Sequence, residues 1–260
     1  MKTSGFNKVT LNSLVCFLLF ISFCGSAHAQ AQVNLKAELK NMHLWRGMQV
    51  ADGMVITTDL SVADKNQYFR GGLWGGTDVN GDYKELDFYV SFTKNRFSFA
   101  IWDIYNYSPE ATYNNREFFN YEARETGHFI DASLAYTISE KFPLTISWAT
   151  VLYGRDRDVQ NTKNLYSTLV CLDYPIWKND KWEIKPGIGG AFALSPAKDE
   201  NGKTTQRNFY GDTAGIVQVT LTTTYNLTAF KRNFPITALA LFNPQSSKGY
   251  FQIGIQLFSF

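Results

Sequence analysis

Short segments in which apolar and polar residues alternate strictly recur along the whole chain. In 84–92, Phe88 and Val90 fall on one face of an extended backbone, and Glu85 and Asp87 fall on the other. A period of two residues is typical of a strand with one buried face, and no segment shows a comparable helical period. The same alternation recurs in 129–138, 144–153 and 217–225. The pattern therefore predicts an all-β fold.

The alternation and the breaks between segments predict about twelve strands, with 10–14 as the range. Their expected bounds are 33–43, 48–60, 67–76, 84–92, 97–107, 129–138, 144–153, 165–174, 182–194, 214–225, 235–242 and 250–260.

The connections between these strands alternate in length. The even connections are short turns, whereas the odd ones are mostly longer and more polar. Short turns at one end and long loops at the other are typical of a closed antiparallel barrel in an outer membrane. A soluble sandwich, the alternative, has no reason to alternate so regularly. The short turns are 93–96, 139–143, 175–181 and 226–233, and the long loops are 108–127, 154–164 and 195–212. Aromatic residues flank the short turns, as in an interfacial girdle: Phe92, Phe97, Phe142, Trp177, Trp182, Phe230 and Phe234.

The N-terminal 29 residues have the layout of an export signal. Lys2 and Lys8 precede the apolar run 14–23, and the small residues of 27–29 suit cleavage. Ten apolar residues are too short for a membrane-spanning anchor helix. We expect residues 1–29 to be removed and 30–260 to form the barrel.

Composition narrows the possible partners. The chain is 45% hydrophobic and 16% aromatic, which excludes a disordered protein. Loss of Lys2 and Lys8 with the signal leaves 23 basic residues against 23 acidic ones, so we expect no nucleic-acid partner. Cys16 and Cys24 leave as well, and Cys171 alone forms no intramolecular disulfide.

Charged residues of both signs lie on the strand face opposite the apolar row. In a barrel that row contacts lipid, so the charges line the lumen as candidate selectivity residues. We expect them to pair across neighbouring strands, with Arg70 opposing Glu85, and to leave the lumen partly plugged. The lumen candidates are Lys36, Glu38, Lys40, Arg70, Glu85, Asp87, Asp131, Asp173, Glu183 and Lys185.

The last strand ends in an aromatic residue, Phe260, as many outer-membrane barrels do. We expect the barrel-insertion machinery to recognise this strand. Phe260 is out of phase with the apolar row that contains Phe251 and Ile253, and a bulge near Phe258 would repair the register. Pro186 is a second irregularity, because proline removes a donor from the ladder.

Three motifs in the first part of the chain resemble a known family. They are Trp45-Arg46-Gly47-Met48-Gln49, Gly72-Leu73-Trp74-Gly75 and Glu85-Leu86-Asp87-Phe88-Tyr89. Their order and spacing are similar to the opening of the Gcw_chp-type small outer-membrane proteins, the TorF family of porins. The resemblance covers about Leu39 to Tyr107 and implies a small barrel with pore activity. Taken by itself, Arg46-Gly47 suits a tight turn at the rim.

The residues give little support to an enzyme. The mature chain holds two histidines, His43 and His128. Barrel lipid hydrolases resemble a pattern with serine two residues after the histidine, but Trp45 and Ile130 stand there. Asp103 is the one acid placed to approach His128, and a lone rim histidine is far more often solvated than catalytic. We expect no catalytic site, no metal and no cofactor.

Three functions remain open for a protein of the Gram-negative outer membrane, where lipid surrounds the barrel, and a barrel enzyme is the least favoured of them. The first is a porin or narrow channel for small polar solutes. The second is surface recognition by a barrel with a plugged lumen, through the aromatic residues of loop 108–127, unless that loop folds inward and plugs the pore. These loop candidates are Tyr113, Phe118, Phe119 and Tyr121.

Overall fold

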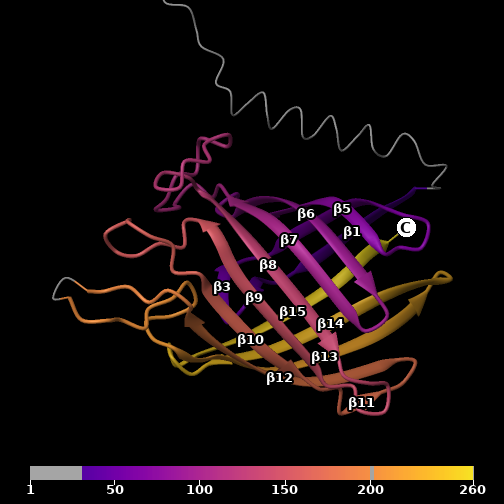
Figure 1. Ribbon diagram of the computed structural model, residues 1–260. Coiled ribbons are helices and arrows are strands. Elements are labelled where there is room, and N and C mark those ends of the chain that lie inside the picture. The colour runs from indigo at the N-terminus through magenta and orange to yellow at the C-terminus, as the bar shows by residue number, and fades with distance from the viewer. Residues whose placement is uncertain (1–30, 200–201, 260) are drawn as a thin grey trace, which may run out of the picture.

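The chain folds into one closed antiparallel β-barrel (Figure 1). The computed structural model describes residues 31–199 and 202–259, so the expected signal 1–29 and Phe260 lie outside the described residues. Within this described part no helix has the length and apolar character to cross a membrane.

Twelve strands form the ring, as the alternation predicted. Each pairs antiparallel with its neighbours, and β10 (Ser167–Asp173) closes the ring against β12 (Trp182–Ala193). The two-residue β11 (Trp177–Lys178) belongs to the turn between them. The ring consists of β1 (Gln32–Lys40), β4 (Val55–Ala63), β5 (Phe69–Asp78), β6 (Lys84–Lys94), β7 (Phe97–Asn106), β8 (His128–Thr137), β9 (Thr145–Gly154), β10 (Ser167–Asp173), β12 (Trp182–Ala193), β13 (Gly215–Ala229), β14 (Arg232–Asn243) and β15 (Lys248–Ser259).

The predicted strands 33–43 and 48–60 were wrong in one respect. Each is divided, and the inner pieces β2 (His43–Trp45) and β3 (Met48–Ala51) pair only with each other. We call residues 43–51 the inner hairpin. It interrupts the path from β1 to β4, which are themselves direct neighbours in the ring.

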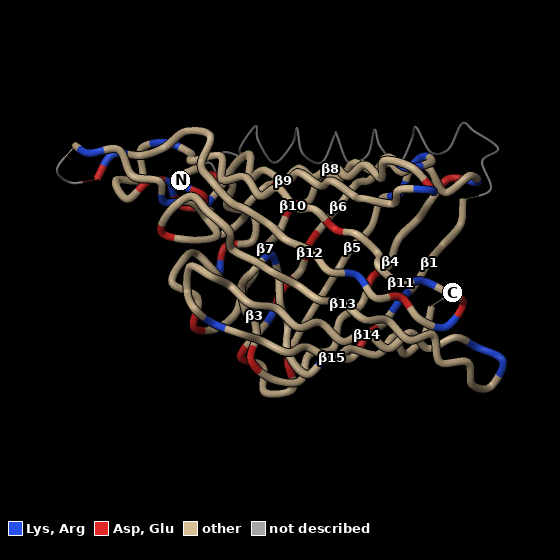
Figure 2. The backbone as a smooth tube through the Cα atoms, turned by 90° about the horizontal axis from the view of Figure 1, so that it is seen from below, with Lys and Arg blue, Asp and Glu red and all other residues tan. Residues whose placement is uncertain are grey.

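The two ends of the barrel differ in the length of their connections, as predicted. The long loops 107–127, 155–166 and 194–214 extend from one end, drawn at the left in Figure 1, and we call it the long-loop end. The opposite, short-turn end carries Gln32 at the start of β1 and Ser259 at the close of β15. Figure 2 places charged segments at both ends of the barrel and fewer between them.

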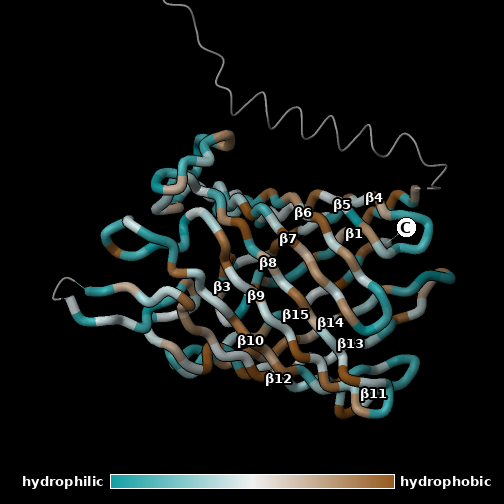
Figure 3. The backbone as a smooth tube through the Cα atoms, viewed as in Figure 1, coloured by the Kyte–Doolittle hydropathy of each residue, from teal (hydrophilic) through white to brown (hydrophobic). Residues whose placement is uncertain are grey.

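Side chains alternate between the two faces of the barrel wall. Apolar and polar stretches follow one another along the strands in Figure 3. The predicted apolar rows face outward: Phe88 and Leu134, for example, are 38% and 41% exposed. Val217 is the exception, since it is fully buried inside the barrel. A bulge in the β12–β13 ladder changes the phase of β13 there.

The bulge predicted in the last strand is confirmed. In the β1–β15 ladder Ala37 pairs with Phe258 but Glu38 pairs with Gln256, so Leu257 is the extra residue. Pro186 is accommodated at the end of β10, where Tyr174 N donates to its carbonyl oxygen at 3.1 Å. The missing N–H of the proline leaves that pair with one bond, and β10 ends there.

Candidate functional site in the barrel lumen

The inner hairpin folds into the lumen instead of standing at the rim. On one side, Gln252 Oε1 of β15 accepts from Leu44 N at 2.9 Å, and Asn243 Nδ2 of β14 donates to Gly47 O at 3.0 Å. On the other side of the lumen, the indole ring of Trp45 in the hairpin packs against Phe129 of β8 with 5.8 Å between ring centroids. The hairpin thus contacts strands on opposite sides of the ring and narrows the passage.

The tip of the hairpin is the Arg46-Gly47 turn. Both residues have positive φ, 48° and 83°, which is the backbone of a tight two-residue hairpin turn. A Cβ added to Gly47 would lie 2.4 Å from Val217 O, so only glycine lets the tip approach β13. The tight turn was correctly predicted, but its placement at the rim was wrong, because the hairpin turns inward.

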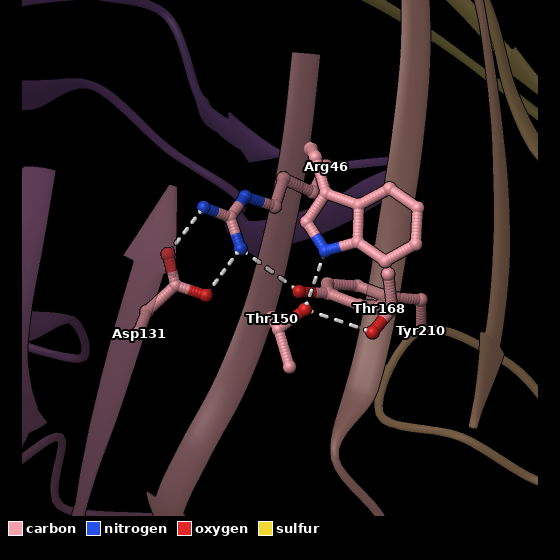
Figure 4. A network of polar contacts seen from close by, with 6 residues as sticks. Arg46, Asp131, Thr150, Thr168 and Tyr210 are labelled. Atoms are coloured by element: carbon pink, nitrogen blue, oxygen red, sulfur yellow. Dashed lines mark hydrogen bonds and ion pairs between the residues drawn. The ribbon is translucent and has the colours of Figure 1, made fainter. Parts of the chain in front are cut away.

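An ion pair across the lumen holds the tip. Arg46 Nη1 and Nη2 donate to Asp131 Oδ1 and Oδ2 of β8 at 2.7 and 2.6 Å, and Nη1 also donates to Tyr210 Oη at 2.8 Å (Figure 4). Asp131 is fully buried. Burial alone would lower the pKa of Arg46, but the bonds to Asp131 and Tyr210 raise it above its ordinary value. For the Tyr210 hydroxyl, burial has the opposite effect and raises the pKa to about 12. A bidentate pair of this kind is both strong and directional.

A cavity of about 640 Å³ remains beside the hairpin, toward the long-loop end. Its walls combine aromatic rings with acidic groups. The residues that matter below are His43, Trp74, Glu85, Asp87, Trp102 and Arg155.

Arg155, directly after β9, extends into this cavity. Its guanidinium carbon lies 3.8 Å from the ring centroid of Tyr113 and 4.7 Å from that of Phe129, within cation–π range. Its Nε has no hydrogen-bond partner, and within the described ranges Arg155 forms no ion pair. Burial lowers its pKa, in contrast to that of Arg46.

Lys40, at the last position of β1, also lines the cavity, whereas the remaining predicted charges of β1 and β12 lie nearer the short-turn end. The carboxylate of Glu38 forms ion pairs with Lys36 Nζ at 2.5 Å and with Lys40 Nζ at 2.9 Å, and all three residues belong to β1. Glu183 lies 3.0 Å from Lys178 Nζ and 4.0 Å from Lys185 Nζ. The expected pairing across neighbouring strands was therefore wrong for Glu38, because residues two apart on one strand share a face. It was found for Glu183, which lies opposite Lys178 of β11.

The predicted opposition of Arg70 and Glu85 was also wrong. Arg70 pairs with Ser91 near the short-turn end, whereas Glu85 pairs with Gly76 near the long-loop end. Arg70 donates instead to Gln67 Oε1 at 2.8 Å. Asp87 and Asp131 lie at the cavity with Glu85, while Asp173 ends β10 at the opposite end of the barrel.

Loop 108–127, which we call the outer loop, has two parts. Its residues 118–121 lie over the outer face of β7 and β8, whereas Ser108, Glu110, Ala111 and Tyr113 line the lumen cavity. Tyr121 stacks on His128 at 4.3 Å between centroids and donates to Asp103 Oδ2 at 2.5 Å. His128 Nδ1 contacts Asp103 Oδ1 at 2.7 Å, as the sequence suggested, and its Nε2 contacts Phe118 O at 2.6 Å. The imidazole is fully buried, and both of its nitrogens are occupied.

The four aromatic loop candidates therefore have different places. Tyr113 turns inward over Arg155, while Phe118 packs on His128 with 5.2 Å between centroids. Tyr121 is half covered at 39% exposure, and Phe119, at 83%, is the most exposed of them.

Sequence reasoning missed Arg155 and Tyr210, and it gave Arg46 no role inside the barrel. Arg46-Gly47 carried a turn signal, but nothing in its neighbours indicates which way the hairpin turns. Arg155 lies in a loop without periodicity, so no pattern points to it.

No family model matches the chain, and no curated protein matches it either. In the part of the chain that the structure describes, no group of three or more histidine, cysteine, aspartate or glutamate residues is placed to hold a metal ion.

Proposed function

We propose that this protein is a narrow channel of the Gram-negative outer membrane, through which small polar solutes pass beside the inner hairpin. The observation that carries the proposal is the lumen itself. A cavity lined by aromatic and charged side chains lies next to a hairpin that one buried ion pair, Arg46 to Asp131, holds across the barrel.

The outer surface supports a lipid environment. Large apolar side chains face outward on successive strands, among them Leu60, Val90, Leu134 and Leu221 at 41–45% exposure. A continuous belt of this kind is costly in water and is expected where strands face hydrocarbon.

Aromatic pairs near the short turns support the same environment. Phe69 and Phe92 have ring centroids 4.9 Å apart, and Trp182 and Tyr225 have theirs 4.6 Å apart. Aromatic rings of this kind concentrate at the edges of a bilayer. In this proposal the long-loop end faces the cell exterior, and the last strand serves the barrel-insertion machinery.

The segment from about Leu39 to Tyr107 resembles the Gcw_chp type, or TorF family, and this resemblance also supports a channel. Membership of that family, with its implied pore activity, is part of the proposal.

Single-channel recording in a planar bilayer tests the channel directly. We expect small, discrete conductance steps from the purified protein. The double variant Arg46→Gln/Asp131→Asn should give larger steps, because the tip of the hairpin loses its attachment without leaving an unpaired charge. Glu125→Gln, on the exposed outer loop, is the matched control and should leave the steps unchanged. Absence of steps from every variant in folded, inserted protein would refute the channel.

Selectivity gives a second measurement. Glu85→Gln or Asp87→Asn removes a negative charge from the cavity wall, and we expect the reversal potential under a salt gradient to shift toward anions. An unchanged reversal potential in a conducting Glu85→Gln/Asp87→Asn variant would exclude these acids as selectivity residues.

Surface recognition is the second candidate function, and Phe119 is the observation that favours it. An aromatic side chain that is 83% exposed is a suitable contact for a partner. Loss of binding of whole cells to a surface ligand on Phe119→Ser, in a protein that does not conduct, would favour this candidate over the channel.

A further inference from the structure

Arg155 is a partly buried cation without an acidic partner, and its Nε atom is buried. Its guanidinium carries five N–H donors, yet the groups that surround it closely are the ring faces of Tyr113, Phe129 and Phe209, the last at 5.5 Å. Its Nε has no hydrogen-bond partner. Burying a guanidinium in this way costs free energy that an anionic group would recover.

Two acids on the same cavity wall lack a cationic partner. Glu85 accepts a bond from Asn106 Nδ2 at 3.0 Å, and Asp87 accepts one from Tyr105 N at 3.3 Å. Within residues 31–199 and 202–259 neither acid forms an ion pair. Arg155 attracts both electrostatically, but it does not contact them closely enough to pair. The cavity therefore holds a guanidinium and two carboxyl groups that are not paired with one another.

The rest of the cavity suits a small organic solute. Trp74 and Trp102 contribute apolar surface. His43 lies at the same cavity, is only 9% exposed and has an Nδ1 without a partner. A volume of about 640 Å³ with aromatic walls and a few convergent polar groups is typical of a small-molecule site.

We propose that this cavity binds a zwitterionic solute, an α-amino acid, whose carboxylate pairs with Arg155 and whose ammonium group pairs with Glu85 and Asp87. This inference rests on the proposed channel, since it names the solute class for the same lumen. A simple anion would leave the two acids unpaired, and a simple cation would leave Arg155 unpaired. A zwitterion satisfies both at once, and the tryptophan rings accept an apolar side chain.

Three probes with the same ring separate these contributions. Phenylalanine carries both charges, phenethylamine only the ammonium group, and 3-phenylpropionate only the carboxylate. Titration calorimetry on the purified, folded barrel in detergent should give phenylalanine an affinity at least tenfold above that of either singly charged probe. Equal affinities for the three probes, or no binding of any, would overturn the inference.

Variants assign the charges to residues. Arg155→Gln should remove the advantage of phenylalanine over phenethylamine, and Arg155→Lys should keep part of it. Glu85→Gln/Asp87→Asn should remove the advantage over 3-phenylpropionate. Arg116→Gln, on the exposed outer loop, is the control and should change nothing. An unchanged ranking of the probes in Arg155→Gln would contradict the assignment.

The binding experiment and the conductance experiment can fail independently of each other. The ranking of probes in the unmodified protein needs no variant, so it decides even where a variant fails to fold. Conductance without probe binding overturns this inference alone. Probe binding without conductance overturns the channel and leaves the binding site.

Discussion

The inner hairpin and the outer loop are two segments of the long-loop end that are fastened to the same pair of strands from opposite faces. The hairpin reaches across the lumen from β1 and bonds to Asp131 of β8. The loop connects β7 to β8 and bonds to Asp103 and His128 on their outer side. In each case a carboxylate on a strand holds a distant piece of chain.

Side-chain parity decides which face each segment occupies. Asp131 points into the lumen, whereas His128, three residues before it, points outward. A shift of one residue in the register would exchange the two faces. The contacts also differ in strength. The hairpin depends on a bidentate ion pair with a fully buried acid, whereas the loop leaves Phe119 and much of Tyr121 exposed. We expect the hairpin to be the more firmly held of the two.

The largest expected effect comes from breaking the inner attachment on one side. Asp131→Asn leaves Arg46 inside the lumen with an uncompensated charge, so we expect a loss of about 3–5 kcal/mol in the free energy of unfolding. Urea titration of the protein in lipid vesicles measures this loss. The double variant Arg46→Gln/Asp131→Asn should recover most of it, because no unpaired charge remains. A single variant as stable as the parent would mean that the ion pair does not hold the hairpin.

The two faces of β8 predict the next effect. Leu134→Arg places a charge on the outward face and should cost about 2–4 kcal/mol near the bilayer midplane. Ser133→Arg, one residue away, faces the lumen and should be tolerated. A folding titration from detergent into lipid measures both. Equal loss of folded protein for the two variants would contradict the assigned faces.

The sequence was sufficient for the ring and for the direction of most side chains. Alternation is a local property, and it predicted the twelve strands, the two unequal ends and the bulge beside Phe258. It misplaced Val217, because Val217 is the extra residue of a bulge in the β12–β13 ladder, and nothing in the sequence of β13 marks that bulge.

The candidate site was less predictable, because it depends on contacts between distant segments. The alternation of side chains along the strands correctly placed three acids in the lumen, Glu85, Asp87 and Asp131, but it did not predict which residues surround them. Arg46 meets Asp131 only because the hairpin turns inward, and Arg155 meets Tyr113 only because a loop folds over the rim. Neither event leaves a periodic pattern.

Acid should weaken the inner hairpin. Burial lowers the pKa of His43 from 6.5 to about 4, so between these pH values the unfolded chain binds a proton that the folded chain does not. Stability is therefore complete above pH 6.5 and falls as the pH drops toward 4, by at most roughly 3 kcal/mol. Unfolding titrations across this range measure the slope. Because carboxylates also titrate near pH 4, the contribution of His43 is the difference from His43→Gln. If the free energy of unfolding falls with pH by the same amount in the parent and in His43→Gln, His43 is not the cause of the acid sensitivity.

The smallest effect is expected for the outer loop. His128→Phe keeps an aromatic ring between Tyr105 and Tyr121 but removes both polar contacts, to Asp103 and to Phe118 O. Losing two such contacts costs about 1–3 kcal/mol, and the loss falls on the loop because the strand ladder of β8 is unchanged. We therefore expect little change in global unfolding but faster trypsin cleavage within the loop.

The cleavage sites make this measurable, since Arg116 and Arg124 are both exposed on the outer loop. Phe119→Ala is the matched control. Its side chain is 83% exposed, so the rate of cleavage should stay close to that of the parent. If His128→Phe is cleaved no faster than Phe119→Ala, the polar contacts of His128 to Asp103 and Phe118 O do not fasten the loop. In that case the outer loop would differ from the inner hairpin only in being more exposed, and it would have no attachment to the strands comparable to the Arg46–Asp131 ion pair.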